Sequence, residues 1–338
     1  MRTNLLNTVT LSEFTDLVEK DFITFQQMVK PVAAQLFIER SMEAHTGDSR
    51  RFDEVDTETY AKLKREGENA KKGSVGIGYN KTMYAKRIAL EIDITWEMRR
   101  YNKKEQVVAL LTSLKHYCPQ RMELDLTHRL TFCTSTSYTD MDGQTVDVTG
   151  GDGLAVVYSA HTLKFSSTTW RNRVSGDPTF SKSALESAEL LARTNILSNF
   201  GERRVMNFNT IISTDDPGTV NDIKQFLKST SEVGQTNPGV INVYQNKYRH
   251  VILPYLATTA VGAYDSTKRQ WWGIVAAGQG ILGWQAYFGI WEAPNLKTPK
   301  EGNNGEDFHN DNWTYGTRAS YGIVVVSGRG LIMSCPSS

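Results

Sequence analysis

The stretch GSVGIGYNKTMYAKRIALEIDI, which runs from Gly73 to Ile94, decides the fold. Its first six residues, Gly73–Gly78, include three glycines, which favour a flexible turn. From Ile88 to Ile94 every second residue is apolar, and this is the period of a β-strand. Glu54–Lys62 and Thr82–Ile94 alternate well enough to be the two strands of a long ribbon, and the glycines predict its tip.

This ribbon is highly charged and has few apolar residues with which to bury its own faces. An isolated pair of strands is marginally stable in water, so we expect a neighbouring molecule to order the ribbon as an extended arm. A solvated hairpin on the surface of the same chain is the alternative. Five basic side chains near the tip are candidate contacts between molecules: Lys62, Lys64, Arg65, Lys71 and Lys72.

The first 45 residues predict an amphipathic helix. Leu17, Val18, Phe22 and Phe25 recur near the helical period, and Pro31 interrupts the pattern. This apolar stripe has little to pack against within its own segment. We therefore expect either an arm that lies on another surface, with Phe22 and Phe25 as contacts, or an ordinary helix packed on its own domain.

The strongest helical pattern spans residues 102–132. Asn102 is a good N-cap, and Glu105 completes a reciprocal capping arrangement three residues later. A wide apolar face follows from Val107 to Tyr117. Pro119 lacks a backbone donor, which predicts a kink or an interruption near His116. The expected element is one long, broken helix.

The remaining elements follow from local signals. A polar, glycine-rich loop is expected at 133–155, and a proline after Asp215 and Asp216 is typical of a helix start. The other predictions, in chain order, are a helix at Ser181–Phe200, a buried strand at Phe208–Ile212, a helix at Thr219–Leu227, a hairpin of Val240–Tyr244 with Tyr248–Leu253, and a final strand pair of Tyr315–Tyr321 with Gly322–Ser327.

The charge balance argues against a dedicated nucleic-acid binder. The chain has 338 residues and a formal net charge of +1, whereas proteins that grip nucleic acid usually carry a basic excess that neutralises phosphates. With 39% apolar residues the chain has enough material for a packed core of two or three lobes. If it contains nucleic acid, we expect it to act as a wall.

Compartment signals are sparse. Cys118, Cys133 and Cys335 share no metal-ligand or disulfide spacing, which favours a reducing cytoplasm as the place of assembly. Met1–Thr10 lacks the pattern of a signal peptide, and no run of 18 apolar residues is present. No membrane association is therefore expected.

One motif resembles a cofactor site. Gly278-Gln-Gly280-Ile-Leu-Gly283 matches the dinucleotide-binding glycine pattern, which needs a strand before it and a helix after it. Too little chain follows for the rest of a nucleotide fold. A nucleotide-dependent oxidoreductase remains an alternative, and glycines used for tight turns and close packing are the preferred interpretation.

Other candidate chemistry is weak. His161 follows Ser159 closely, but no nucleophile elbow or third partner accompanies them, which favours a structural histidine. His309 and Asp311 lack zinc spacing, and the loop aspartates lack the spacing of a calcium loop. We expect no catalytic residue, no metal and no cofactor. The aspartates are Asp140, Asp142, Asp147 and Asp152.

Three segments resemble recurring stretches of the major capsid proteins of tailed bacteriophages, the family with the Hong Kong 97-type fold. In the first, Asp152-Gly153 precedes the apolar run Leu154–Tyr158, and His161 then leads to a polar tract. The second, Phe208–Pro217, is similar to the family's buried strand before a helix. The third, Asn312–Gly322, resembles its near-terminal strand, with Arg318 before an aromatic-glycine pair.

The resemblance implies an α+β chain with a Hong Kong 97-type fold and no enzymatic activity. Its parts would be an N-terminal arm (1–45), an extended loop or β-ribbon (46–95), a peripheral domain with a spine helix (96–200), an axial domain (201–296) and return strands to the peripheral domain (297–338).

The implied function is self-assembly into an icosahedral shell around double-stranded DNA, through pentamers and hexamers. Scaffolding, portal and decoration proteins are further implied partners. Since no long scaffolding segment precedes Met1, either the chain is a matured product or a separate scaffolding protein guides assembly, and the initiator-like Met1 favours the second. The implied location is the virion capsid, assembled in the host cytoplasm. Some relatives link subunits through lysine–asparagine isopeptide bonds, for which Lys62, Lys64, Lys71 and Lys72 are possible donors. A nanocompartment shell around a cargo enzyme is the alternative within the same fold.

Overall fold

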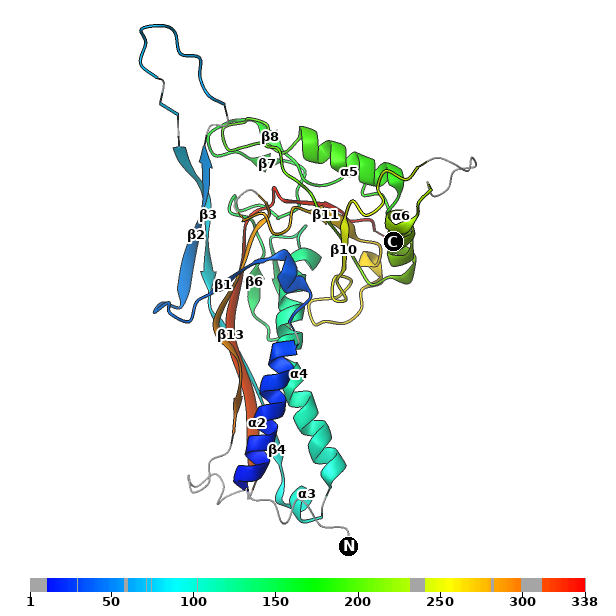
Figure 1. Cartoon of the computed structure of the whole chain (residues 1–338). Helices are drawn as coiled ribbons and strands as arrows, with labels where there is room; N and C mark the ends of the chain where they lie inside the picture. Colours follow the sequence, from blue (N-terminus) through cyan, green and yellow to red (C-terminus); the bar gives the residue numbers. More distant parts are fainter. Residues whose placement is uncertain are drawn as a thin grey trace.

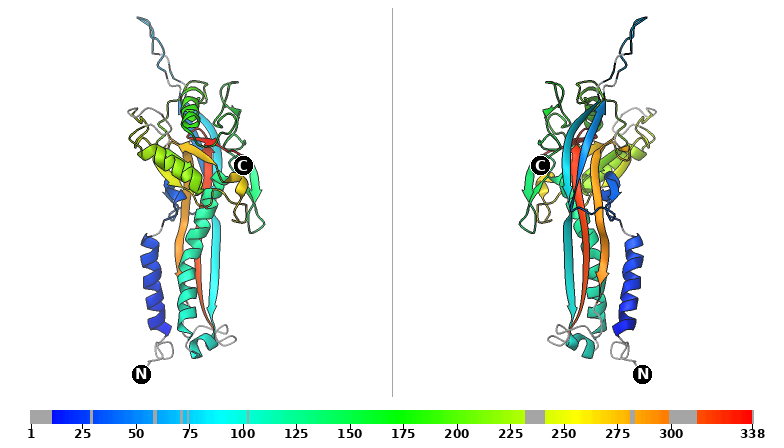
Figure 2. Two further views of the ribbon diagram at one scale, coloured as in Figure 1. Left: turned by 90° about the vertical axis from the view of Figure 1, so that its right-hand side faces the viewer. Right: turned by 90° about the vertical axis from the view of Figure 1, so that its left-hand side faces the viewer.

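The computed structural model of the chain describes residues 11–28, 30–57, 60–70, 72–73, 75–101, 103–231, 241–280, 283–298 and 312–337. The molecule is elongated, with long strands and two long helices along one end and a mixed lobe at the other (Figures 1 and 2). Helices and sheets occur together, which confirms the α+β class. Along the chain, a helix, a ribbon, a long helix, a mixed lobe and a pair of long strands follow one another.

A four-stranded sheet runs along the elongated end. Its order is β1 (Ile38–Ser41), β12 (Gln285–Lys297), β13 (Trp313–Ser327) and β4 (Lys86–Ile94). Strand β13 is antiparallel to both β12 and β4, so it is the long central strand of the sheet. The predicted final strand pair is therefore wrong, because one continuous strand spans both halves.

Gly322 explains that error. It resembles a turn residue in the sequence, but in β13 it pairs with Gly289 of β12. A Cβ at position 322 would collide with the Tyr84 main-chain oxygen and the Met83 side chain. The glycine therefore permits close approach of the ribbon strand to the sheet.

Helix α4 (Lys104–Thr131) packs along this sheet, preceded by the short α3 (Trp96–Arg100). It is continuous through Pro119, so the predicted interruption is wrong. The proline removes one backbone donor, but the flanking Cys118 and Met122 lie in the core and hold the helix on both sides. Asn102, the predicted cap, lies outside the described residues. Lys103 occupies the N-cap and makes no capping hydrogen bond through its side chain.

Helix α2 (Leu11–Met28) packs against α4 of the same chain. Val18 is buried in a cluster with residues of α4, β4 and β13, and Phe22 is buried as well. Asp21 forms an ion pair of 2.8 Å with Lys115, and the Phe25 ring meets the His116 ring edge-on at 4.4 Å between centroids. The helix packed on its own domain is thus the alternative that the structure adopts.

The mixed lobe contains a second sheet, with α5 (Lys182–Thr194) and α6 (Pro217–Lys228) beside it (Figure 1). Local signals predicted both helix starts: Ser181 accepts a hydrogen bond from the Ala184 amide, and Asp216 accepts one from the Thr219 amide. The sheet order is β10 (Arg249–Ile252), β9 (Thr210–Ser213), β11 (Trp272–Val275) and β14 (Leu331–Ser334).

The predicted hairpin of Val240–Tyr244 with Tyr248–Leu253 is wrong. Val240 lies outside the described residues, and β10 pairs in parallel with β9. Tyr244 and Tyr248 are buried in the lobe's core, so their apolar character reflects packing and not strand pairing.

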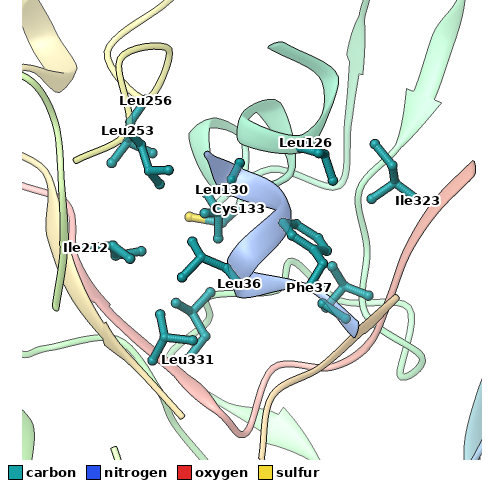
Figure 3. Packing of buried hydrophobic residues seen from close by; sticks show 14 of the residues in the cluster. Leu36, Phe37, Leu126, Leu130, Cys133, Ile212, Leu253, Leu256, Ile323 and Leu331 are labelled. Atoms are coloured by element: carbon teal, nitrogen blue, oxygen red, sulfur yellow. The ribbon is translucent and has the colours of Figure 1, made fainter. Parts of the chain in front are cut away.

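The main core lies where the two sheets and α4 meet. The short 3-10 helix η1 (Ala33–Leu36) inserts there, and Figure 3 shows Leu36 and Phe37 beside Leu130 and Cys133 of the α4 end. The Glu123 carboxylate accepts the Ala33 amide at 3.1 Å and thereby fixes η1 to α4. The smaller elements are the hairpin β5 (Ser137–Thr139) with β6 (Thr145–Asp147), the pair β7 (His161–Thr162) with β8 (Thr169–Trp170), and the 3-10 helix η2 (Ser266–Lys268).

Candidate subunit interface

The ribbon consists of β2 (Ser49–Thr57) and β3 (Val75–Tyr84) in antiparallel register. The predicted pairing of Glu54–Lys62 with Thr82–Ile94 is therefore wrong in both strands, which overlap β2 and β3 only at 54–57 and 82–84. The predicted glycine tip is wrong as well, because Gly76 and Gly78 lie within β3. The alternating run Ile88–Ile94 belongs to β4, where Ile92 and Ile94 pack on the cluster around α4. An alternating pattern marks one buried face and does not reveal which partner covers it.

A buried ion pair anchors the base of the ribbon to the body. Arg329, between β13 and β14, pairs through Nη1 with the Glu54 carboxylate of β2, and both side chains are at most 3% exposed. Arg329 Nη2 donates to Asn199 Oδ1 at 3.0 Å, and Nε donates to the Leu197 carbonyl at 2.6 Å. The Asp56 carboxylate accepts the Asn199 amide at 2.7 Å. The proximal ribbon is thus part of the folded subunit.

Sequence reasoning missed this anchor because Glu54 and Arg329 are 275 positions apart. A signal was present in Gly328-Arg329-Gly330. A Cβ at Gly328 would collide with the Val156 carbonyl, and one at Gly330 with the Trp284 backbone. Two glycines that flank an arginine indicate that the backbone is closely packed there and that the arginine side chain is buried.

A second layer supports Arg329. Its guanidinium lies 5.2 Å from the centroid of the Trp170 ring, and the His161 ring stacks on Trp170 at 4.2 Å. His161 Nδ1 lies 2.6 Å from Asp152 Oδ2, and Nε2 lies 3.1 Å from Asn172 Oδ1. Both ring nitrogens of this buried histidine thus have structural partners, which agrees with the structural interpretation of His161.

The apolar run Leu154–Tyr158 forms no strand. Val156 and Val157 are buried in the main core, and the Asn172 side-chain amide donates to the Val156 carbonyl at 2.8 Å. The side chain of Asn172 thus takes the place of a partner strand.

The distal ribbon is exposed and projects beyond the body (Figure 1). Every described residue from 60 to 73 is exposed, including the apolar Tyr60 (63%) and Leu63 (81%). Four of the predicted basic contacts lie in this exposed tip: Lys62, Lys64, Arg65 and Lys72. Lys71 lies outside the described residues.

The other two predicted contacts lie at the opposite end. Phe22 is 4% exposed and Phe25 is partly buried against α4, so neither offers a free surface in this conformation. The exposed face of α2 carries Leu17 (68%) and Ile23 (54%) instead.

The cofactor motif lacks its helix. Gly278 and Gly280 adopt positive φ values of 74° and 59° in the turn after β11, and β12 begins at Gln285 directly after the motif. Ile281 and Leu282 lie outside the described residues. A dinucleotide site needs a helix N-terminus at this point, so the structure contradicts the oxidoreductase alternative.

Other ionisable clusters have structural roles. Asp140 accepts from Lys86 at 2.8 Å and from Arg121 at 3.3 Å. Burial acts to raise the pKa of Asp140, but the hydrogen bonds from Lys86 and from two backbone amides lower it overall. Within the described ranges no group of histidine, cysteine or carboxylate side chains could hold a metal ion. His309 and Asp311 lie outside those ranges. None of the helices found there is long and apolar enough to cross a bilayer.

Comparison of the sequence with protein-family models and with curated proteins finds no match. Among solved structures, a chain of Gordonia phage Cozz is 11% identical over 91% of this chain and 87% of that chain, with a TM-score of 0.49. A chain of the Cyanophage Pam1 capsid asymmetric unit is 14% identical, covering 88% and 87%, with a TM-score of 0.49. The virus-like particle from Pyrococcus furiosus is 12% identical, covering 94% and 97%, with a TM-score of 0.47.

Proposed function

We propose that this chain is the repeating subunit of a closed icosahedral shell, with the Hong Kong 97-type capsid fold, and that the shell encloses double-stranded DNA. The observation that carries the proposal is the ribbon: its base is fixed by a buried ion pair, while its tip is fully exposed and carries apolar side chains. A rigid base supports a tip that reaches away from the subunit. Such a tip gains stability only on another molecule.

The energetic argument concerns Tyr60, Leu63 and the exposed Ile77 of β3. Full burial of a large apolar side chain contributes roughly 1.5–3 kcal/mol relative to exposure. In a closed shell every subunit buries its tip side chains against a neighbour, so this small gain in free energy is repeated at each contact. The basic residues Lys62, Lys64, Arg65 and Lys72 would then set register and partner choice at the rim of the contact.

The remaining parts of the proposal follow from this assembly. Pentamers and hexamers of the chain form the shell, while scaffolding, portal and decoration proteins take part in its assembly. The near-neutral net charge of +1 suits a wall that holds DNA without sequence-specific contacts. Assembly in the host cytoplasm and residence in the virion capsid belong to the same proposal.

The experiment replaces one tip residue. Leu63→Asp should leave the free energy of unfolding of the subunit within about 0.5 kcal/mol of wild type, because position 63 is exposed. Particle formation, measured by size-exclusion chromatography of freshly expressed protein, should be lost. Leu63→Met is the matched control and should assemble normally. Wild-type yields of particles from Leu63→Asp would contradict the role of the tip.

The contents of the particles separate a genome shell from a nanocompartment. Nuclease-treated particles purified from an infected host should contain protected double-stranded DNA. A stoichiometric cargo protein without nucleic acid would instead establish the nanocompartment alternative.

A further inference from the structure

Three sulfur-containing side chains meet in the main core, where the turn after α4 faces β14. Cys133 Sγ donates to Met333 Sδ at 3.6 Å. Leu331, Met333 and Cys335 belong to the main core, whereas Ile332 lies in the core of the mixed lobe. Alternate positions along an extended chain share one face, so Cys335 faces the same side as Met333. The side chains of Cys133 and Cys335 accordingly lie in hydrogen-bonding contact.

Backbone hydrogen bonds hold both cysteines in place. The Val157 amide donates to the Cys133 carbonyl at 2.8 Å. On the other side, the Cys335 amide donates to Asp177 Oδ1 at 3.1 Å, and the Met333 amide donates to the Asn172 carbonyl at 3.1 Å. The folded backbone therefore keeps the two cysteine sulfurs close together, although they come from distant parts of the sequence.

Both cysteines are free thiols in this structure. The hydrogen bond with Cys133 and burial raise the pKa of the Cys335 thiol well above its usual range. Exchange with another disulfide requires a thiolate, so the pair is protected while this part of the chain is closed. Ser337, two positions beyond Cys335, is exposed, and local opening of this segment is therefore the route by which the thiols react.

We infer that Cys133 and Cys335 form a disulfide bond within one chain when the protein meets an oxidising medium, with a small disulfide such as oxidised glutathione as the oxidant. The Cys335 thiolate attacks one sulfur of the oxidant and releases a first glutathione thiolate. Cys133 then attacks Cys335 Sγ and releases the second. Each released thiolate takes up a proton that a cysteine has lost, so two cysteine thiols are oxidised and one oxidised glutathione is reduced to two thiols.

The bond joins the end of α4 to the segment after β14 and closes a loop of roughly 200 residues. In a reducing compartment the pair stays as two thiols, because the glutathione pool there opposes oxidation. This inference does not depend on the ribbon tip or on the assembly that we propose for it.

The test compares the folded and the denatured chain. The full purified chain is incubated in glutathione buffers with a rising share of the oxidised form, with and without concentrated urea, until the extent of oxidation is constant. Free thiols are then blocked with iodoacetamide, and peptide mapping without reduction identifies the linked cysteines. The folded chain should link Cys133 to Cys335. The denatured chain should favour a bond between Cys118 and Cys133, because that pair closes the shortest loop.

The oxidised chain should also unfold at a Tm roughly 5–10 °C above that of the reduced chain. Cys335→Ala should abolish both the bond and this rise. Cys118→Ala is the matched control, since Cys118 is a buried cysteine whose Sγ meets Thr317 Oγ1 at 3.4 Å, and it should retain both.

The mapping of the folded wild type decides even where a variant fails to fold. Cys133 and Cys335 that remain free, or that are joined only to glutathione, at the highest share of the oxidant would overturn the inference. A bond that uses Cys118 in the folded chain would overturn it as well.

Discussion

At the scale of single residues, Arg329 and Glu54 connect the part of the chain that reaches outward with the part that folds. The guanidinium has the Glu54 carboxylate, the Asn199 amide oxygen and the Leu197 carbonyl as acceptors, so its buried charge is well satisfied. Removing one partner of such a pair is costly, because the other charge stays buried without compensation.

Glu54→Gln should therefore lower the free energy of unfolding by about 3 kcal/mol. Urea denaturation of the unassembled subunit measures this loss. Asp53→Asn is the control on the same strand, since the Asp53–Arg51 pair is exposed on both sides and surface pairs contribute about 0–1 kcal/mol. Equal effects of the two substitutions would show that the buried pair does not anchor the ribbon.

His128 on α4 makes the stability of the subunit depend on pH. Burial lowers its pKa from 6.5 to about 4, and its Nε2 contacts Thr258 Oγ1 at 3.2 Å. The unfolded chain binds the proton more tightly than the folded chain, so stability is complete above pH 6.5 and falls as the pH drops toward 4.

The fall amounts to about 3 kcal/mol over this window. His128→Gln should flatten the corresponding part of the curve of unfolding free energy against pH. His45→Gln, at an exposed position, should leave the curve as in wild type. A wild-type slope in His128→Gln would assign the acid sensitivity to other groups.

At the scale of elements, the sequence predicted those helices whose starts depend only on neighbouring residues. The caps at Ser181 and Asp216 and the apolar face of α5 needed no knowledge of distant residues. Strand partners did not follow in the same way, because β4 pairs with β13 from the far end of the chain. The basic tip was predictable from composition, whereas its anchor at Arg329 depends on contacts that only the folded chain creates.

Pro119 shows where a local signal is overruled. A proline inside a helix costs about 3 kcal/mol, yet α4 continues through it because both flanks pack into the core. The same packing brings Cys133, just beyond α4, into hydrogen-bonding contact with Cys335, which the spacing of the cysteines does not reveal.

Pro119→Ala should raise the free energy of unfolding by about 1–3 kcal/mol, since alanine restores the backbone donor and suits a helix. Chemical denaturation measures the gain, and Gln120→Ala at the exposed neighbouring position should change stability by less than about 0.5 kcal/mol. A loss of stability in Pro119→Ala would mean that the proline ring itself is needed at this position.

At the scale of the whole molecule, the two ends of the subunit differ in how much of their apolar surface is buried within the chain. The N-terminal helix needs no neighbour in this structure, since α2 packs against α4 of its own chain. In the ribbon tip, by contrast, every described residue from 60 to 73 is exposed. The proposed shell therefore depends on the tip, and the arm would contribute through its exposed Leu17 and Ile23.

Sedimentation velocity of the purified wild-type chain over a series of concentrations tests this dependence most directly. We predict one large, uniform species made of many copies, in equilibrium with little or no intermediate, because each tip is satisfied only when a neighbour receives it. A single monomeric boundary that persists at the highest concentration, under conditions in which the chain is folded, would contradict the proposed assembly.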